Sequence, residues 1–172
     1  RSFTDQLIIN WREHPSIYEL ALHGYVHPDV RDLLDEPGST KPPLSAQFVP
    51  SREIAGVVQK CHVGFVGYVP TDQNFHLISR ASGQLVEFLR LGKPVIACGT
   101  TDLNDFVSER RVGIGITDPS QMPSAITKIM DGYQEYARNA LKLFDEEFNF
   151  ARYESGLLKF SGLMPSDEDV RT

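Results

Sequence analysis

The chain has 172 residues, of which 41% are hydrophobic and 23% charged, and this composition fits one soluble globular domain with a sizeable core. The net charge of −6 argues against a general nucleic-acid binder, which needs a basic face. No signal peptide, long apolar run or metal-type Cys/His spacing is visible, and Cys61 and Cys98 lie in or beside apolar runs. We therefore expect a cytoplasmic protein with reduced, buried cysteines. Because the chain begins with Arg1 rather than Met, we also expect it to be part of a longer protein.

Apolar spacing and Gly/Pro punctuation predict the elements in chain order. The first half gives a helix over 3–13, a strand over 17–22 that ends in His23-Gly24, a short helix over 29–35, a strand over 45–49, a helix over 52–60 capped by Ser51, a strand over 62–68 and a polar loop over 69–75. The second half gives a helix over 83–91, a strand over 94–98, a helix over 100–107, a strand over 112–117 and helical segments from 120 almost to the end, with a break near Asn149.

Five short apolar strands that alternate with helices are typical of a doubly wound parallel sheet. The sequence therefore predicts an α/β, Rossmann-like sheet of about five to six strands, with helices on both faces and long C-terminal helices. We expect residues 1–162 to form this domain and residues 163–172 to form a flexible tail. In such a sheet, ligands bind beyond the carboxyl ends of the strands.

The segment 79–96 joins a small-residue turn, a short helix and a buried strand. Ser82 and Gly83 stand where the helix begins, and unpaired N–H groups at a helix N-terminus favour an anion. Glu87 lies off the apolar face of this helix, and Gly92 ends it before an apolar run. The pattern predicts an anion-binding site at the start of the helix.

Gly-Lys-Pro-Val-Ile over 92–96, with Glu87 seven residues ahead of Pro94, resembles the nucleotide-sugar site of GT-B fold glycosyltransferases, in their C-terminal, donor-binding domain. The resemblance implies a nucleotide-diphosphate sugar as substrate, with no metal or other cofactor. It also implies an N-terminal acceptor domain on the full-length chain, and peripheral membrane contact only through parts outside this chain. The family has one more, central strand ahead of the first helix. Either the sheet closes with five strands, or that strand lies upstream.

The same resemblance assigns roles around the helix start. Glu87 would accept hydrogen bonds from ribose hydroxyls, because an ionised carboxylate is only an acceptor. Ser82, Gly83 and Gln84 would meet the phosphates through N–H groups, and the Arg80 guanidinium would pair with the diphosphate. The alternatives are a plain helix cap, a solvated glutamate and a solvated loop arginine.

Three further segments fall at predicted carboxyl ends of strands. His23 is either a phosphate contact or a turn histidine. Val49 and Ser51 border the nucleobase in the resemblance, or simply end a strand and cap a helix. The loop from Tyr68 to Asn74 faces the donor sugar in the resemblance, or is an ordinary surface loop.

One departure limits the resemblance. Many retaining GT-B enzymes have a second glutamate eight positions before the one equivalent to Glu87, and Ser79 stands there. The catalytic residues are therefore unknown. Two other functions are kept open: a non-catalytic module that docks a partner protein, and a sugar-nucleotide epimerase-like domain, for which no clear carboxylate pair is visible.

Overall fold

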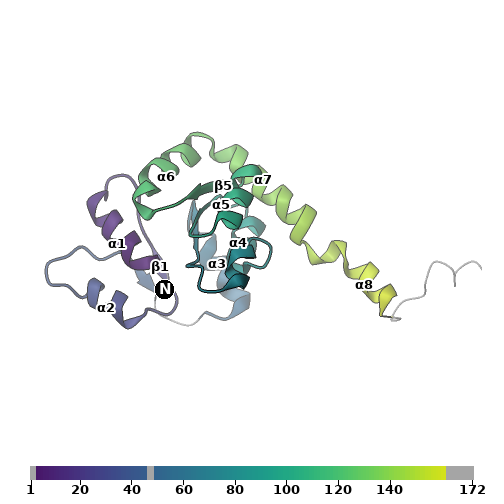
Figure 1. Cartoon of the computed structure of the whole chain (residues 1–172), viewed down its shortest axis with the longest axis horizontal. Coiled ribbons are helices and arrows are strands. Elements are labelled where there is room, and N and C mark those ends of the chain that lie inside the picture. The colour runs from purple at the N-terminus through teal and green to yellow at the C-terminus, as the bar shows by residue number, and fades with distance from the viewer. Residues whose placement is uncertain (1–2, 46–48, 162–172) are drawn as a thin grey trace, which may run out of the picture.

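The computed structural model describes residues 3–45 and 49–161, which form an α/β fold (Figure 1). The α-helices are α1 (Thr4–Glu13), α2 (Pro28–Leu34), α3 (Ile54–Val58), α4 (Gly83–Arg90), α5 (Thr101–Glu109), α6 (Met122–Asp131), α7 (Tyr133–Leu143) and α8 (Glu154–Phe160). The strands are β1 (Leu22–His23), β2 (Leu44–Ser45), β3 (Gly64–Gly67), β4 (Val95–Cys98) and β5 (Gly113–Ile116).

The strands form two parallel sheets rather than the single sheet of five to six strands that the sequence predicts. One sheet pairs β1 with β2, and the other has the order β3-β4-β5. The predicted strand over 17–22 shrinks to Leu22–His23, and that over 45–49 becomes Leu44–Ser45, with residues 46–48 outside the described residues. Both short strands are exposed or half-exposed. Parallel strands are normally covered on both faces, and these two strands are not.

The three-stranded sheet has helices on both faces, as predicted. Along the central strand β4, Ile96 and Cys98 join a core cluster with residues of α1 and α6, whereas Val95 and Ala97 join a cluster with residues of α4, α5 and α7. This alternation follows from the two-residue period of a strand. All four residues of β4 are buried, which explains why the sequence reads there as an uninterrupted apolar run.

Both cysteines are free thiols, as expected. Cys98 is fully buried, and burial raises the pKa of its thiol to about 11. Burial also raises the pKa of the half-buried Cys61 thiol. Neither group therefore has the lowered pKa that makes a cysteine a nucleophile.

Two helical regions differ in detail from the predictions. The helix expected over 52–60 is a 3₁₀ turn, η1 (Ser51–Glu53), followed by the short α3, and the Ser51 side chain makes no capping hydrogen bond. Ser51 lies inside the turn because Pro50 precedes it in the extended conformation. The long C-terminal helical region divides at Gly132 and again at Asn149, the second break being the predicted one.

The C-terminal region holds several short helical segments, and its last helix leaves the body of the molecule (Figure 1). A 3₁₀ turn, η3 (Pro119–Gln121), precedes α6, and a π-helical turn, η4 (Phe144–Phe148), and a 3₁₀ turn, η5 (Phe150–Arg152), separate α7 from α8. The predicted tail over 163–172 lies outside the described residues. Among the helices that are described, none is both long and apolar enough to cross a bilayer.

Candidate functional site

The start of α4 is fixed by a serine cap that is itself held by a tyrosine. Ser82 is 1% exposed, and its Oγ accepts a hydrogen bond from the Leu85 backbone N–H at 3.1 Å. The Tyr68 hydroxyl lies 2.9 Å from the same Oγ. Because Tyr68 directly follows β3, this bond joins the carboxyl end of a strand to the start of the next helix. The structure therefore brings together two residues that the sequence predicts as site residues.

The next two backbone amides are available to a ligand. Within the described residues, no hydrogen bond is made by the N–H groups of Gly83 and Gln84, and both residues are exposed. A Cβ placed on Gly83 would have no atom within 4 Å, so the space beside it is open. Unpaired amides at a helix N-terminus carry partial positive charge. The predicted anion site is thus accessible and unobstructed.

Glu87 lies one turn farther along α4 than these amides. Its Oε2 accepts a hydrogen bond from Arg90 Nη2 at 2.6 Å, and 35% of its side chain is exposed. No described residue bonds to the other carboxylate oxygen, which is therefore free to accept from a ligand hydroxyl. The pairing within one helix is also what a solvated surface glutamate would show.

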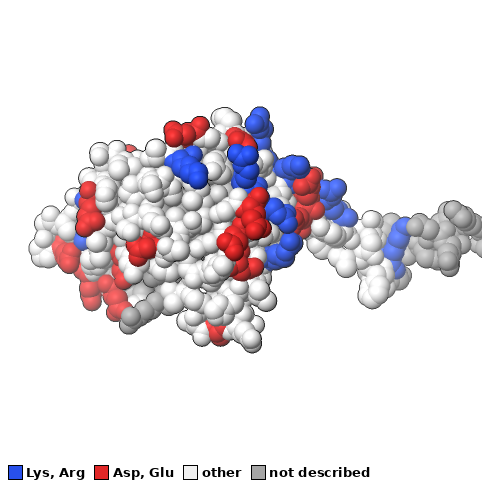
Figure 2. Space-filling model, turned by 45° about the horizontal axis from the view of Figure 1, so that its top comes forward, with Lys and Arg blue, Asp and Glu red and all other residues white. Residues whose placement is uncertain are grey.

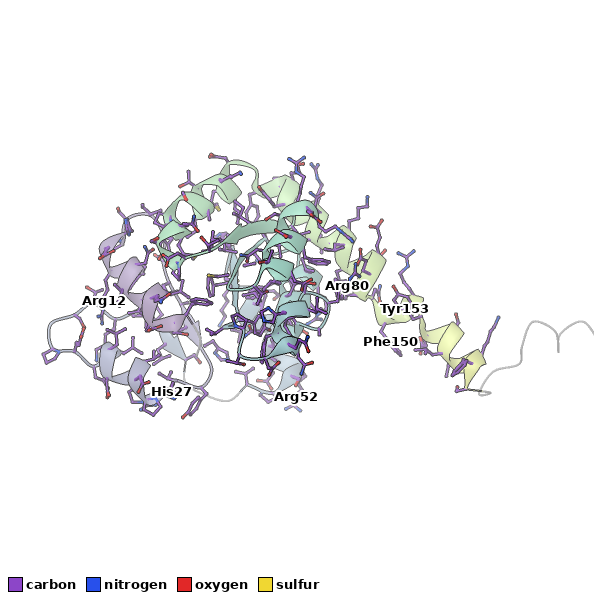
Figure 3. The ribbon with its side chains drawn as sticks, viewed as in Figure 1. Arg12, His27, Arg52, Arg80, Phe150 and Tyr153 are labelled. Atoms are coloured by element: carbon purple, nitrogen blue, oxygen red, sulfur yellow. The ribbon has the colours of Figure 1, made fainter. Side chains whose placement is uncertain are left out.

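Arg80 is engaged elsewhere. Its Nη1 donates to Glu147 Oε2 at 2.6 Å, and its guanidinium lies 5.5 Å from the centre of the Phe106 ring. Arg110 also pairs with Glu147 and lies over the same ring. The hydrogen bond from Arg110, assisted by the positive charges of both arginines, holds the pKa of Glu147 below its ordinary value. Arg80 therefore points toward the C-terminal helices (Figure 3) rather than standing free beside the anion site.

Charged side chains of both signs are interleaved where the C-terminal helices leave the body, whereas acidic side chains predominate at the opposite end (Figure 2). Opposite charges that alternate in this way favour pairing between neighbours. Arg80 thus lies in a region where positive charge is already matched by negative charge.

The loop after Tyr68 folds back over it. The predicted loop over 69–75 contains the start of a 3₁₀ turn, η2 (Gln73–Leu77), which is capped by Asp72 through the Asn74 N–H at 2.8 Å. The rings of Tyr68 and Phe75 lie 5.9 Å apart. Asn74 itself is exposed. Its side chain makes no hydrogen bond to another described residue.

The other three predicted site residues lie on β1 or just before α3. No hydrogen bond or ion pair between described residues joins His23, Val49 or Ser51 to the start of α4. His23 is exposed on the two-stranded sheet, Val49 is half-buried, and Ser51 is exposed in η1.

Ser79 stands where the resemblance would lead one to expect a glutamate. It is 4% exposed, and its backbone N–H donates to Asp102 Oδ2 at 2.8 Å. Asp102, in the first turn of α5, thus holds this backbone amide in place. A glutamate at position 79 would place its side chain in a buried environment.

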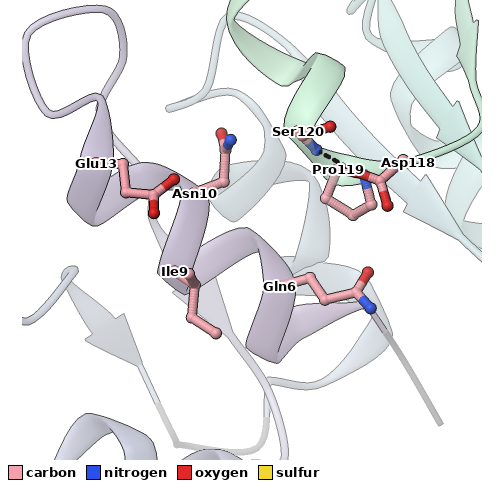
Figure 4. Close-up of a pocket in the computed structure, with 7 residues that line it drawn as sticks. All are labelled: Gln6, Ile9, Asn10, Glu13, Asp118, Pro119 and Ser120. Carbon is pink, nitrogen blue, oxygen red and sulfur yellow. Dashed lines mark hydrogen bonds between the residues drawn. The ribbon is translucent and has the colours of Figure 1, made fainter.

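One cavity was not anticipated from the sequence. It measures about 270 Å³ and lies between α1 and η3, lined by Gln6, Ile9, Asn10, Glu13, Asp118, Pro119 and Ser120 (Figure 4). Asp118 accepts from the Ser120 N–H at 2.8 Å, and hydrogen bonds to Ser120 lower the pKa of its carboxyl. With two carboxylates in its wall, this cavity disfavours a phosphate group. Its residues are scattered over two elements, so only tertiary packing reveals it.

No protein-family model matches the chain, and a comparison with curated proteins finds no match. Among the residues that the structure describes, no group of three or more His, Cys, Asp or Glu side chains is placed to hold a metal ion.

Proposed function

We propose that this chain is the donor-binding part of a GT-B type glycosyltransferase and binds a nucleotide-diphosphate sugar at the start of α4. One observation carries the proposal: two open, unpaired amides, those of Gly83 and Gln84, follow the buried cap Ser82 at the carboxyl end of β3. Parallel α/β sheets bind phosphates at this kind of position. The free carboxylate oxygen of Glu87 suits a ribose hydroxyl.

The proposal includes a single doubly wound sheet for the complete protein. Every strand pair is parallel, and one core cluster contains Leu20, next to the two-stranded sheet, together with Ile96 of the three-stranded sheet. The resemblance places a further strand between the two sheets. We also propose that the sugar is transferred to an acceptor, that another domain binds this acceptor, and that the protein is cytoplasmic.

Donor binding can be tested by calorimetric titration of the protein with UDP-, GDP-, ADP- and CMP-sugars. We expect one of them to bind with a Kd below about 1 mM. Replacement of Glu87 with Ala should weaken that binding about tenfold, because hydrogen bonds to a charged acceptor are lost. A matched control is Glu135→Ala on α7, since Glu135 is also an exposed glutamate paired with an arginine, at 3.0 Å from Arg111.

Two results would contradict these assignments. Unchanged affinity in the Glu87→Ala variant would remove its ribose role. Absence of binding for every donor would remove the donor site, and would favour a non-catalytic module that docks a partner protein.

A further inference from the structure

Arg80 pairs with Glu147, and this ion pair belongs to a cluster that we call the Glu147 clamp. The Glu147 clamp comprises Glu147, the two arginines that pair with it, Arg80 and Arg110, and the Phe106 ring beneath both guanidinium groups. Phe148, next to Glu147, packs edge-to-face on Phe106 with ring centres 6.4 Å apart. The clamp therefore attaches η4, the turn between α7 and α8, to α5 and to the segment that leads into α4.

Arg80 has an exposed side chain on a backbone segment that is held in place just before α4. Arg80 comes two residues before the cap Ser82, and its neighbours are held by the Ser79 N–H bond to Asp102 and the Ala81 N–H bond to Ile78 O at 2.9 Å. Its own side chain is 62% exposed. Arg80 is thus close in sequence to the first turn of the helix, where the Gly83 and Gln84 amides are unpaired.

Glu147 keeps a partner when Arg80 leaves. The Glu147 side chain is 22% exposed. Its Oε2 binds Arg80, and its Oε1 binds Arg110. Removing one partner of a charge that keeps another costs little, because no buried charge is left unpaired. The ion pair to Arg80 is partly exposed, and such pairs are weak. The clamp can therefore release Arg80 at small cost.

We propose that Glu147 and the diphosphate of the donor compete for Arg80, so that donor binding loosens the attachment of the C-terminal helices. This inference rests on the proposed function. A phosphate is the stronger partner, since it offers several charged oxygens to a planar guanidinium. Glu147 is thus a positioning residue: it acts on the donor only through Arg80. By linkage, whatever weakens the Arg80–Glu147 pair itself strengthens donor binding to the same extent.

The test measures the affinity for the nucleoside diphosphate of the best-binding donor in four variants by calorimetry. Glu147→Gln should bind about two- to fivefold more tightly, the factor that corresponds to a partly exposed ion pair. Arg80→Ala should bind about tenfold more weakly, and Arg80→Ala/Glu147→Gln should match Arg80→Ala. Arg110→Ala should bind more weakly than the unmodified protein, because Glu147 then has Arg80 as its one clamp partner.

Amide hydrogen exchange is the second measurement. Saturating nucleotide should raise amide exchange over 144–153 in the unmodified protein and not in Arg80→Ala. If the unmodified protein binds nucleotide but Glu147→Gln binds no more tightly, the competition is wrong while the donor site stands. If Glu147→Gln also raises nucleotide affinity in the Arg80→Ala background, Glu147 does not act through Arg80 and the inference also fails. If neither the unmodified protein nor any variant binds nucleotide, the proposed function fails, and this inference fails with it. Arg110→Ala keeps the test decisive should Glu147→Gln fold poorly.

Discussion

The carboxyl ends of the two sheets differ in how tightly they are built. At the three-stranded sheet, Gly99 follows β4 and Ser82 caps α4, and both are in close contact with Tyr68. At the two-stranded sheet, Gly24 follows β1 with open space around it, and His27 caps α2 while 65% of its side chain is exposed. The same local devices, a positive-φ glycine and a helix cap, thus occur in both regions. Only in the first are they part of a packed site.

Burial on both faces accounts for this difference. β4 is covered by two core clusters, so its neighbours have fixed positions against which a cap or a turn can be aligned. β1 and β2 each have two residues, and Leu44 is 43% exposed. A preorganised ligand site requires rigid support. The three-stranded sheet therefore offers the more rigid support for the donor site that we propose.

The two glycines give the largest expected contrast. Gly99 has φ +107° and a Cβ there would overlap the Tyr68 carbonyl oxygen, whereas Gly24 has φ +113° with nothing within 4 Å. Gly99→Ala should lower the free energy of unfolding by about 3 kcal/mol or more, since strain and overlap add. Gly24→Ala should cost about 1 to 2 kcal/mol from strain alone. Urea denaturation measures both, and equal losses would show that the two edges are packed alike.

The two helix caps give an intermediate contrast. Ser82→Ala should cost about 1 to 2 kcal/mol, because Leu85 N–H and the Tyr68 hydroxyl both lose a partner in a buried place. His27→Ala removes an exposed cap whose nitrogen lies 3.4 Å from the Asp29 N–H, and should cost about 0.5 kcal/mol or less. Thermal unfolding of the two variants measures the difference. A loss for His27→Ala as large as that for Ser82→Ala would contradict the distinction.

A small effect should come from Glu147 and should depend on pH. Its pKa is lowered in the folded protein, chiefly by the Arg110 hydrogen bond, so its contribution is present above the pKa of the unfolded chain and is lost as pH falls through the folded value. Glu147→Gln should cost no more than about 1 kcal/mol at neutral pH, and this cost should vanish in acid. Glu146→Gln is the control, since Glu146 lies 3.9 Å from Lys142 in an exposed pair. A cost that does not change with pH would exclude the carboxylate as its source.

The sequence predicts the elements of the three-stranded sheet well because local signals and burial agree there. The helix over 83–91 is α4 (Gly83–Arg90), and the strands expected over 94–98 and 112–117 are β4 and β5. The first strand was predicted too long, because an apolar run does not report whether a second face is covered. A helix cap at Ser82 was one of the two alternatives that the residue types left open. The bond from Ser82 to Tyr68 was not predicted, since the two residues are 14 positions apart.

Sequence by itself determined that a helix starts at Gly83 behind a small polar cap, that β4 is buried and that Glu87 lies off the apolar face of α4. These features depend on neighbours within one or two turns or on a two-residue period. Tertiary structure alone decided that the strands divide into two sheets and that Arg80 binds Glu147, 67 positions away. It also placed a cavity between α1 and η3. Such contacts depend on how distant elements pack, and no local pattern encodes that packing.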